Sequence, residues 1–498
     1  MTPMIISHDL GTTGNKATLV DERGSIVASV TVNYDTDFAS GGKAEQDPEE
    51  WWRALCEATR SLLDSVEGAQ ERIAAVSFSG QMMGAVLLDA HCQAVRPAII
   101  WADTRSTSQA AHLVDRVGME AGYRITGHRL NATYSLSKVM WVRDNEPETF
   151  ARVRHVLCAK DYVAYRLTGV LATDPSDASG TNAYDQSSGT WSAELIEAAG
   201  VGELFPEIVA STTVIGAVTA EASSATGLTV GTPVVMGGGD GPMAALGVGV
   251  VDAASGAYTY LGSSSWVSFA SDAPLHDPGM RTMTFNHVIP GRFVPTATMQ
   301  AGGASLQWIV EALQPDDPGA YAELLGAAAR SRASSDDLYF LPHLLGERSP
   351  YWNPKARAAF VGLARHHGPA NLVRAVVEGV AFNLFTGLDA FSANGAKISR
   401  VDAIGGAANS AHLLQICSDV WGVPIRRRAL VDEATALGAA VVGGVGVGMF
   451  DDFAIAARMS ELTGDFSPAP QAHDQYAVAH ARFLDAYSRL EPWFEGAS

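Results

Sequence analysis

Two stretches of the chain alternate between apolar and polar positions as β-hairpins do. Residues 4–20, MIISHDLGTTGNKATLV, read as an apolar strand, a turn rich in Gly and Thr, and a second strand. Residues 256–270, GAYTYLGSSSWVSFA, repeat this plan about half a chain later. Period-two alternation broken by glycine is typical of a hairpin. The repeat predicts two similar domains that face one nucleotide, and a chance pair of hairpins is the alternative.

Amphipathic helices alternate with apolar strands through the rest of the chain. The first helix is expected to begin at Asp47, because Pro48 follows it and Glu50 stands three residues later, as a capping box requires. This alternation favours an α/β fold. The predicted strands are 73–79, 85–88, 97–101, 232–236, 338–342 and 400–404, and the later predicted helices are 160–167, 243–250, 304–313, 371–388, 412–420 and the tail from 474.

Length and charge narrow the class of protein. The 498 residues are too many for one ordinary core, and we expect two domains at 1–247 and 248–498. Apolar residues make up 47% and charged residues 18% of the chain, which is a globular composition. The net charge of −20 disfavours nucleic acid and anionic membranes as partners. Small molecules held by local positive sites are the expected partners.

The cysteines and the apolar runs indicate where in the cell the protein is expected. The four cysteines are far apart and show no metal-ligand spacing, which fits buried thiols in a reducing cytosol. The N-terminus shows no basic-then-apolar leader, so no signal peptide is expected. The most apolar late run, 434–450, is short and contains five glycines. It predicts a buried helix and loop instead of a membrane span.

The turn of the first hairpin carries candidate chemistry. Glycine lets backbone N–H groups converge on an anion, and Thr12, Thr13 and Lys16 add donors. The carboxylate of Asp9, just before Gly11, would repel a bound phosphate unless a cation lay between them. This pattern predicts a phosphate site with Mg²⁺ near Asp9. An ordinary hairpin with a surface Asp is the alternative.

The run GGGDGP at 237–242 contains the strongest single candidate for a catalytic residue. Asp240 follows an apolar strand and is flanked by glycines, so its carboxylate is accessible to a ligand, as a general base must be. The helix predicted to follow it would bring a positive helix end nearby. The alternative is that Asp240 only caps that helix.

Other loops follow predicted strands, where ligand-binding groups of α/β domains gather. The junction 405–409, GGAAN, can admit a flat adenine ring, although tight strand–helix packing also needs such glycines. Gln81 and Asp103 are either ligand contacts or plain turn residues. The polar run 174–185 either contacts a polyhydroxylated ligand or forms a surface loop, and 346–350 is expected to form a lip of the cleft.

These motifs, in this order, carry a family resemblance. The chain has no GxxxxGK[ST], GxGxxG, HExxH or GxSxG motif, so phosphate binding is expected to use the paired hairpins. DLGTTGNK, the second hairpin, GGGDG and GGAANS resemble the FGGY carbohydrate kinases of the actin/sugar-kinase superfamily. Residues 135–145 and 360–378 resemble the two signatures of that family. The similarity covers about the whole chain and is greatest to xylulose kinases, through AEQDPEEWW, GQM, WADTR, KDYVAYRLTG and FLPHLLGERSP.

The resemblance implies a fold and a set of site residues. It implies two ribonuclease-H-like domains around a deep cleft, with sugar bound mainly to the first domain and ATP mainly to the second. Asp240 would be the proton acceptor, and Asp9 would be the second catalytic residue, linked to Mg²⁺ through water. The implied sugar contacts are Gln81, Met82, Met83, Asp103 and Asp240. The implied ATP contacts are Thr12, Thr13, Asn15, Lys16, Gly262, Ser263, Gly302, Gly405, Gly406 and Asn409.

The implied activity is transfer of the γ-phosphate of ATP to a terminal hydroxyl of a small ketose, D-xylulose or a related pentulose, in the cytoplasm. Two positions depart from the xylulose kinase pattern. Met83 stands where those kinases usually have His, and Gly241 where they usually have Asn. A thioether hardly hydrogen-bonds a sugar, so another ketose or a polyol is an alternative acceptor. A non-catalytic sugar sensor and a chaperone-type ATPase on the same fold are further alternatives, and a homodimer is left open.

Overall fold

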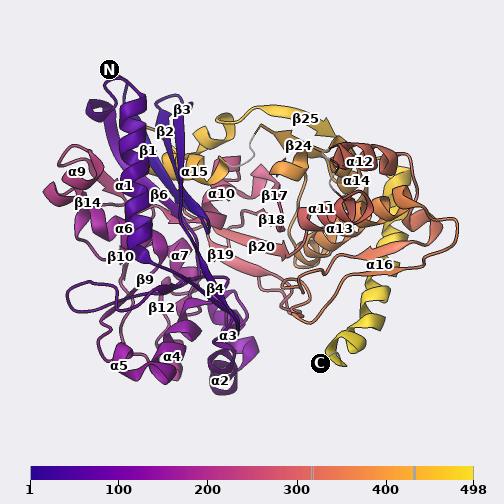
Figure 1. Ribbon diagram of the computed structural model, residues 1–498, viewed down its shortest axis with the longest axis horizontal. Coiled ribbons are helices and arrows are strands. Elements are labelled where there is room, and N and C mark those ends of the chain that lie inside the picture. The colour runs from indigo at the N-terminus through magenta and orange to yellow at the C-terminus, as the bar shows by residue number, and fades with distance from the viewer. Residues whose placement is uncertain (1, 316, 318, 430–432, 497–498) are drawn as a thin grey trace.

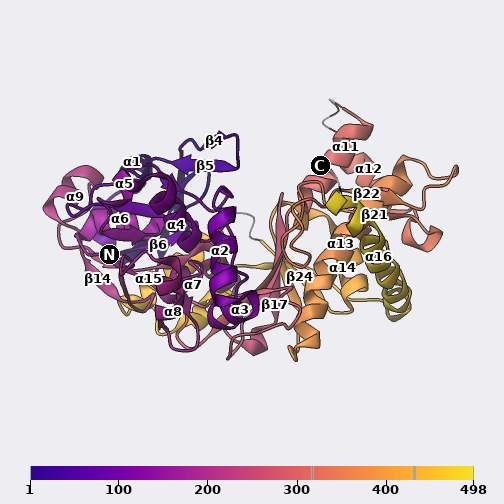
Figure 2. The same ribbon diagram turned by 90° about the horizontal axis from the view of Figure 1, so that it is seen from below.

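The computed structural model describes residues 2–315, 317, 319–429 and 433–496, and the chain folds into two bodies. Figure 1 shows the first body in indigo to magenta and the second in salmon to yellow, side by side along the long axis. Figure 2 shows the same division from below. Each body is built on a seven-stranded sheet.

The first sheet gathers strands from residues 4 to 239. Its order is β14-β15-β6-β1-β2-β3, with β16 beside β6. β1, β6 and β15 are parallel, whereas β2 and β3 run antiparallel to their neighbours. The strands are β1 (Met4–Leu10), β2 (Gly14–Asp21), β3 (Ile26–Asn33), β6 (Ile73–Gly80), β14 (Val214–Ala217), β15 (Pro233–Val235) and β16 (Gly238–Gly239).

The second sheet repeats that arrangement. Its strands are β17 (Ala257–Leu261), β18 (Ser265–Phe269), β19 (Met283–Asn286), β20 (Phe293–Met299), β23 (Val401–Ile404), β24 (Ile425–Arg428) and β25 (Leu462–Phe466). They lie in the order β19-β20-β18-β17-β23-β24-β25. From β20 to β24 the strand directions match those from β3 to β15. The prediction of two hairpins that open two similar ribonuclease-H-like domains is confirmed.

Successive residues of a strand face opposite sides of the sheet, so each face of the first sheet packs against its own helices. Ile6 and Leu19 share one core with residues of α1 and α6, whereas Ile5 and Val20 share another with α10 and α15. The covering helices are α1 (Pro48–Ser65), α6 (Ala159–Thr168), α9 (Ala220–Thr226), α10 (Asp240–Val248) and α15 (Ala434–Gly446).

Helix α15 follows the second sheet's β24 in the chain, yet it packs on β1 and β6 of the first sheet. Figure 1 shows its orange ribbon beside the indigo strands. The buried helix expected within 434–450 is therefore confirmed. No helix in the described ranges is long and apolar enough to cross a membrane. The domain boundary between 247 and 248 stays a prediction.

Helices α13 (Pro369–Ala393) and α14 (Ala411–Trp421) pack on the second sheet, and α11 (Gly303–Leu313), α12 (Ala320–Ala329) and α16 (Pro470–Gly496) pack against these two helices. Phe483 and Tyr487 of α16 are buried in the same core as the sheet. This contact confirms that the C-terminal tail packs on the second domain.

Shorter elements complete the two bodies. The small sheets pair β4 (Asp37–Ala39), β5 (Lys43–Gln46) and β8 (Ala98–Ile99); β7 (Val86–Leu88) and β9 (His155–Leu157); β10 (Ala172–Thr173) and β13 (Glu207–Ile208); β11 (Tyr184–Asp185) and β12 (Thr190–Trp191); and β21 (Tyr339–Leu341) and β22 (Ala359–Val361). The remaining helices are α2 (Thr107–Val117), α3 (Met119–Thr126), α4 (Ser135–Asn145), α5 (Pro147–Phe150), α7 (Pro175–Ser179) and α8 (Ala193–Ala199). The 3₁₀ turns are η1 (Gln70–Arg72), η2 (Ala253–Ser255), η3 (Ser334–Asp336), η4 (Gly406–Asn409) and η5 (Phe453–Arg458).

Three local expectations need correction. Asp47 does cap α1, but its carboxylate accepts from Glu49 N, and Glu50 pairs with Arg53 at 2.8 Å instead of closing a capping box. The helix predicted to start at Met243 begins earlier, at Asp240. The surface-loop reading of the polar run 174–185 is wrong, because that run contains α7 and is mostly buried. The four cysteines are free, and Cys56, Cys158 and Cys417 are buried as expected.

Candidate active site

A cavity of about 350 Å³ lies between the two bodies. The first body contributes Met82, Met83, Trp101, Asp240 and Gly241, and α15 contributes Thr435. The second body contributes Tyr258, Ser264, Ser265, Trp266, Ser268, Met283, Phe285, Thr296, Thr298, Met299, Gln300, Leu345 and Arg348. A concave, largely apolar site with a few convergent polar groups is the usual form of a small-molecule site.

Asp240 is the first residue of α10 and lines the cavity. The N-cap position belongs to Gly239, so Asp240 does not hold the capping position that was the alternative. Its Oδ1 accepts a hydrogen bond from Gly241 N at 2.8 Å. Burial, and then the charge of Asp9, raises the pKa of Asp240 to about 7. A carboxyl group with this pKa can gain or lose a proton near neutral pH.

A buried polar network fixes the backbone that carries Asp240. Ser176 Oγ accepts a hydrogen bond from Gly239 N at 2.9 Å and donates one to Asp174 at 2.6 Å. Lys160 Nζ lies 3.1 Å from Asp174, and both side chains are fully buried. Because Ser176, Asp174 and Lys160 each have a partner, these contacts specify one conformation of the turn.

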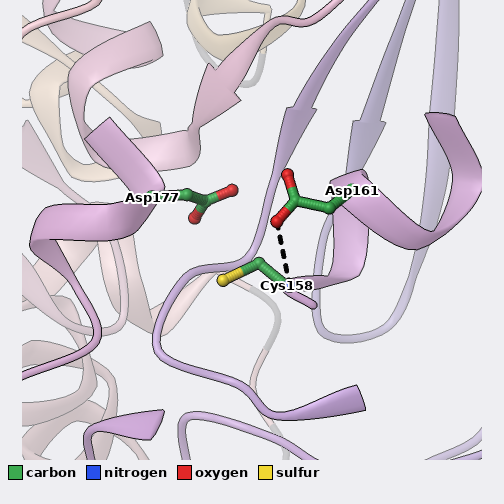
Figure 3. A group of neighbouring side chains, drawn as sticks. All are labelled: Cys158, Asp161 and Asp177. Atoms are coloured by element: carbon green, nitrogen blue, oxygen red, sulfur yellow. Dashed lines mark hydrogen bonds between the residues drawn. The ribbon is translucent and has the colours of Figure 1, made fainter. Parts of the chain in front are cut away.

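The same network contains a cluster of metal-ligand types. Ligand atoms of Cys158, Asp161 and Asp177 lie within 4.8 Å of one another, and Figure 3 shows the three side chains converging. Lys160 Nζ lies 2.6 Å from Asp161 Oδ1 and 3.2 Å from Asp177 Oδ2. Burial opposes a charged Lys160, but the carboxylates around it raise its pKa well above the usual range. The ammonium group thus supplies the cation, and the cluster is structural.

Asp9 of β1 lies close enough for its charge to act on Asp240. Its Oδ2 accepts a hydrogen bond from Thr435 Oγ1 of α15 at 2.6 Å. Its Oδ1 is buried and has no hydrogen-bond partner among the described residues. Burial raises the pKa of Asp9, and the bond from Thr435 opposes that shift. An unpaired carboxylate oxygen beside a second carboxylate fits Mg²⁺ or a water of its shell.

The carbonyl groups of the first hairpin turn are engaged inside the first body. Gly11 O accepts from Tyr34 Oη at 2.6 Å, and Thr12 O accepts from Gln46 Nε2 at 2.6 Å. Thr13 O accepts from the backbone N–H of Tyr34 at 3.2 Å. With these oxygens held away, the turn is suited to present N–H groups to an anion.

Two other residues predicted for the ATP phosphates differ in their surroundings. The Asn15 side chain is buried and pairs with His8 Nδ1 at 3.1 Å, so it supports the hairpin. Lys16 Nζ lies 3.6 Å from Glu433, near the start of α15. Only Lys16 of the two carries a charge that can act on a phosphate.

The second hairpin turn meets the start of α11. Gly303 N donates to Gly262 O at 2.8 Å, and Ala304 N donates to Ser263 O at 3.1 Å. Gly302 is the N-cap of α11, so Gly262, Ser263 and Gly302 lie together. The first N–H groups of the helix are thus used within this junction, and the serine hydroxyls of the turn are the donors it can offer an anion.

The junction after β23 lies beside this turn, because β17 and β23 are parallel neighbours. Gly405 has a φ of +93°, and a Cβ there would lie 2.8 Å from Leu261 O, so close packing requires this glycine. A Cβ on Gly406 would meet nothing within 4 Å, which leaves open space before Asn409. The first glycine therefore serves packing, and the second leaves room for a ligand.

Apart from Asp240, the predicted sugar contacts divide into two pairs. Met82 and Met83 line the cavity, and Gln81 and Asp103 do not. Gln81 Nε2 donates to Gln46 Oε1 at 2.8 Å. Asp103 is fully buried, and its carboxylate accepts from Ala44 N at 2.7 Å and pairs with Arg105. The geometry gives no support to a sugar contact by these two side chains.

Several cavity residues lacked a clear signal in the sequence. Trp101 stands in the WADTR run, and Trp266 directly follows the second turn, but an aromatic residue in a strand reads equally as core. Thr435 lies within the apolar run 434–450, whose pattern predicts only a buried helix and loop. Arg348 belongs to the run 346–350 that is predicted to form a lip of the cleft, and of that run Arg348 lines the cavity.

Models of two sugar-kinase domains match the chain. The N-terminal domain of the FGGY family of carbohydrate kinases matches residues 4–247, and its C-terminal domain matches 257–447. The chain belongs to the FGGY family of carbohydrate kinases. This FGGY kinase is 34% identical to the xylulose kinase of Escherichia coli K12 over 490 residues, covering 98% of this chain and 99% of that one.

Solved structures of FGGY kinases share the fold. A ligand-bound xylulose kinase from Lactobacillus acidophilus has a TM-score of 0.94 at 28% identity, with 100% of both chains covered. A gluconate kinase from the same organism has a TM-score of 0.93 at 28% identity, with 98% of each chain covered. The chain is therefore an ATP-dependent sugar kinase with the two-domain FGGY fold, and its cofactor is Mg²⁺.

Proposed function

We propose that this FGGY kinase phosphorylates a terminal hydroxyl of a small ketose, D-xylulose or a related pentulose. The observation that carries this proposal is Asp240, a carboxylate with a pKa of about 7 that lines the cavity between the two bodies. The identity of 34% to a xylulose kinase over nearly the whole chain supports D-xylulose as the first acceptor to test.

In the proposed reaction, Asp240 accepts the proton of the sugar hydroxyl as that oxygen bonds to the γ-phosphorus. The bond from the γ-phosphorus to the bridging oxygen breaks, and ADP leaves. The two hairpin turns hold the phosphates through N–H and hydroxyl groups. Asp9 would hold Mg²⁺, which neutralises developing phosphate charge when bound. Because the chemistry needs mainly position and charge, closure of the two bodies would exclude water.

A sugar acid such as gluconate is the second candidate acceptor. Arg348 lines the cavity, and its Nε is buried without a hydrogen-bond partner among the described residues. Its Nη2 lies 3.7 Å from the sulfur of Met283. A guanidinium with spare donors suits a carboxylate. This observation favours a carboxylate-bearing acceptor over an uncharged polyol.

The test is release of ADP from MgATP with a panel of ketoses, polyols and D-gluconate. Turnover with D-xylulose well above all others supports the main proposal. Turnover with D-gluconate alone supports the second candidate. Preference for an uncharged polyol contradicts both.

Met83 offers a specificity test, because its φ of 63° holds it in a conformation that His adopts more readily than most residues. An imidazole at this position can hydrogen-bond a sugar hydroxyl, so Met83→His is expected to raise kcat/KM for D-xylulose about 5–10-fold. Met83→Leu is the matched control, since it keeps an apolar side chain on the same backbone. Equal gains in both variants would show that the hydrogen bond is not the cause.

The pH dependence follows from Asp240, whose pKa is raised to about 7. Only the ionised carboxylate can accept the hydroxyl proton. We expect kcat/KM for the sugar to fall about tenfold per unit below pH 7 and to level off above it. Binding of MgATP measured over the same range separates this effect from titration of the nucleotide. A flat profile would contradict Asp240 as the base.

A further inference from the structure

A second cavity, of about 440 Å³, lies where the chain passes from the first body to the second. It is formed by β23, β24 and the start of β25, by η5, and by the chain that leaves α10 at Gly249. Asp402 in its wall stands directly opposite Tyr258, which lines the candidate active site. Paired residues of neighbouring strands share one face of a sheet, so the two cavities lie on the same face of the second sheet.

The positive and negative charges of the side chains around this cavity are unequal in number. Arg400, Arg426 and Arg428 face one carboxylate, Asp402, among the residues of its wall. Arg426 holds Asp402 through two bonds of 2.8 and 3.0 Å, and Arg428 Nε reaches the same carboxylate at 2.6 Å. Both oxygens of Asp402 are therefore used, and the residues of the cavity wall carry an excess of two positive charges.

Arg400 is not among the arginines that donate to the carboxylate of Asp402. Its Nε is buried and has no hydrogen-bond partner among the described residues. Its stem is held against the backbone of Gly256, where a Cβ would lie 2.8 Å from Arg400 Cγ. A buried guanidinium donor without an acceptor is costly unless an anion completes it.

We propose that this cavity binds a phosphate dianion, either inorganic phosphate or the phosphate group of a small metabolite. Two excess positive charges match a dianion, and guanidinium forks match the geometry of phosphate oxygens. Arg400 is the principal donor. Arg426 completes the site with the donors that Asp402 leaves unused, and Arg428 braces it by donating to the carbonyls of Ala457 and Ser460 at 3.2 and 3.1 Å.

The position of the cavity links the anion to the helices that carry residues of the candidate active site. Turn η5 packs on both α10 and α15, the helices that carry Asp240 and Thr435. An anion held between β23, β24 and the chain at Gly249 therefore bridges the second sheet and these helices. An anion site at this place goes beyond the proposed sugar phosphorylation.

The experiment is a titration by calorimetry with inorganic phosphate and, separately, with glycerol 3-phosphate, at constant ionic strength. We expect wild type to show a saturable site and Arg400→Gln to bind at least about 10-fold more weakly. Arg489→Gln removes one exposed arginine of α16 and should bind as wild type does. Tighter binding of the monoester identifies a metabolite as the source, and equal affinity identifies inorganic phosphate.

Identical binding by wild type and Arg400→Gln would overturn the proposal, since any phosphate bound would then lie in the main cleft. Absence of a saturable site in wild type would overturn it as well. If Arg400→Gln fails to fold, Leu462→Asp serves instead, because Leu462 lines the cavity and is 52% exposed. The added carboxylate should weaken phosphate binding to a similar extent while leaving the core intact. Unchanged binding in this variant counts against the site.

Discussion

Replacement of Asp240 by Asn is expected to lower turnover about 10²–10⁴-fold, the usual contribution of a general base. The amide keeps the size of the side chain but cannot accept the hydroxyl proton. Binding of MgATP should be largely kept, because the hairpin turns do not depend on Asp240. Steady-state kinetics with the best acceptor, together with a nucleotide titration, measure both effects. Turnover within a few-fold of wild type would contradict the proposed role.

A stability measurement distinguishes loss of the general base from loss of the folded state as the cause of the lower turnover. Burial raises the pKa of Asp240 to about 7, so the folded state disfavours its ionised form; this cost grows as the pH rises from the ordinary pKa of an aspartate and is complete above pH 7. The Asn variant escapes the cost and should be at least as stable as wild type at alkaline pH. Asp47→Asn is the matched control, because Asn caps α1 as well as Asp does and should leave turnover unchanged.

Replacement of Asp9 by Asn is expected to raise the Mg²⁺ concentration for half-maximal activity about 10–100-fold. The unpaired Oδ1 would no longer belong to a carboxylate, while the bond from Thr435 could still be accepted. Titration of activity with Mg²⁺ at saturating ATP measures the shift. Asp21→Asn, at the far end of the same hairpin, should have no effect on it.

The same variant has a second readout that a merely structural defect would not produce. The charge of Asp9 contributes to the raised pKa of Asp240. Asp9→Asn should therefore move the acidic limb of the pH–rate profile to lower pH. An unchanged Mg²⁺ requirement together with an unchanged profile would show that Asp9 acts on neither the metal nor Asp240.

Local pattern was sufficient for the hairpins and for Asp240. Alternation broken by glycine identified β1–β2 and β17–β18, and their equal place in two halves of the chain implied the repeated sheet. The glycines before Asp240 indicated an exposed turn, and the carboxylate does line the cavity. These features depend on residues that are neighbours in sequence, so a sequence pattern can report them.

Features that depend on distant partners were not predictable in this way. The direction of Asp103 is decided by Ala44 and Arg105, so a polar residue after a strand became an internal brace. The polar run at 174–185 is buried because Lys160 supplies the opposite charge. The spacing of hydrophobic residues does not show which charged side chain will pair with a buried one. It also does not show which sheet a helix will pack against.

Helix α15 has a consequence for how the protein is made. It covers a face of the first sheet formed by Ile5, Val20, Ala75 and Val235, although it is encoded almost two hundred residues after that sheet is complete. At a synthesis rate of about 5–20 residues per second, the part of this apolar face that α15 covers stays exposed on the ribosome for about 10–40 s. During that interval the nascent chain is a natural client for chaperones. A shortened chain that ends at residue 247 would keep the face exposed permanently, and we expect it to aggregate.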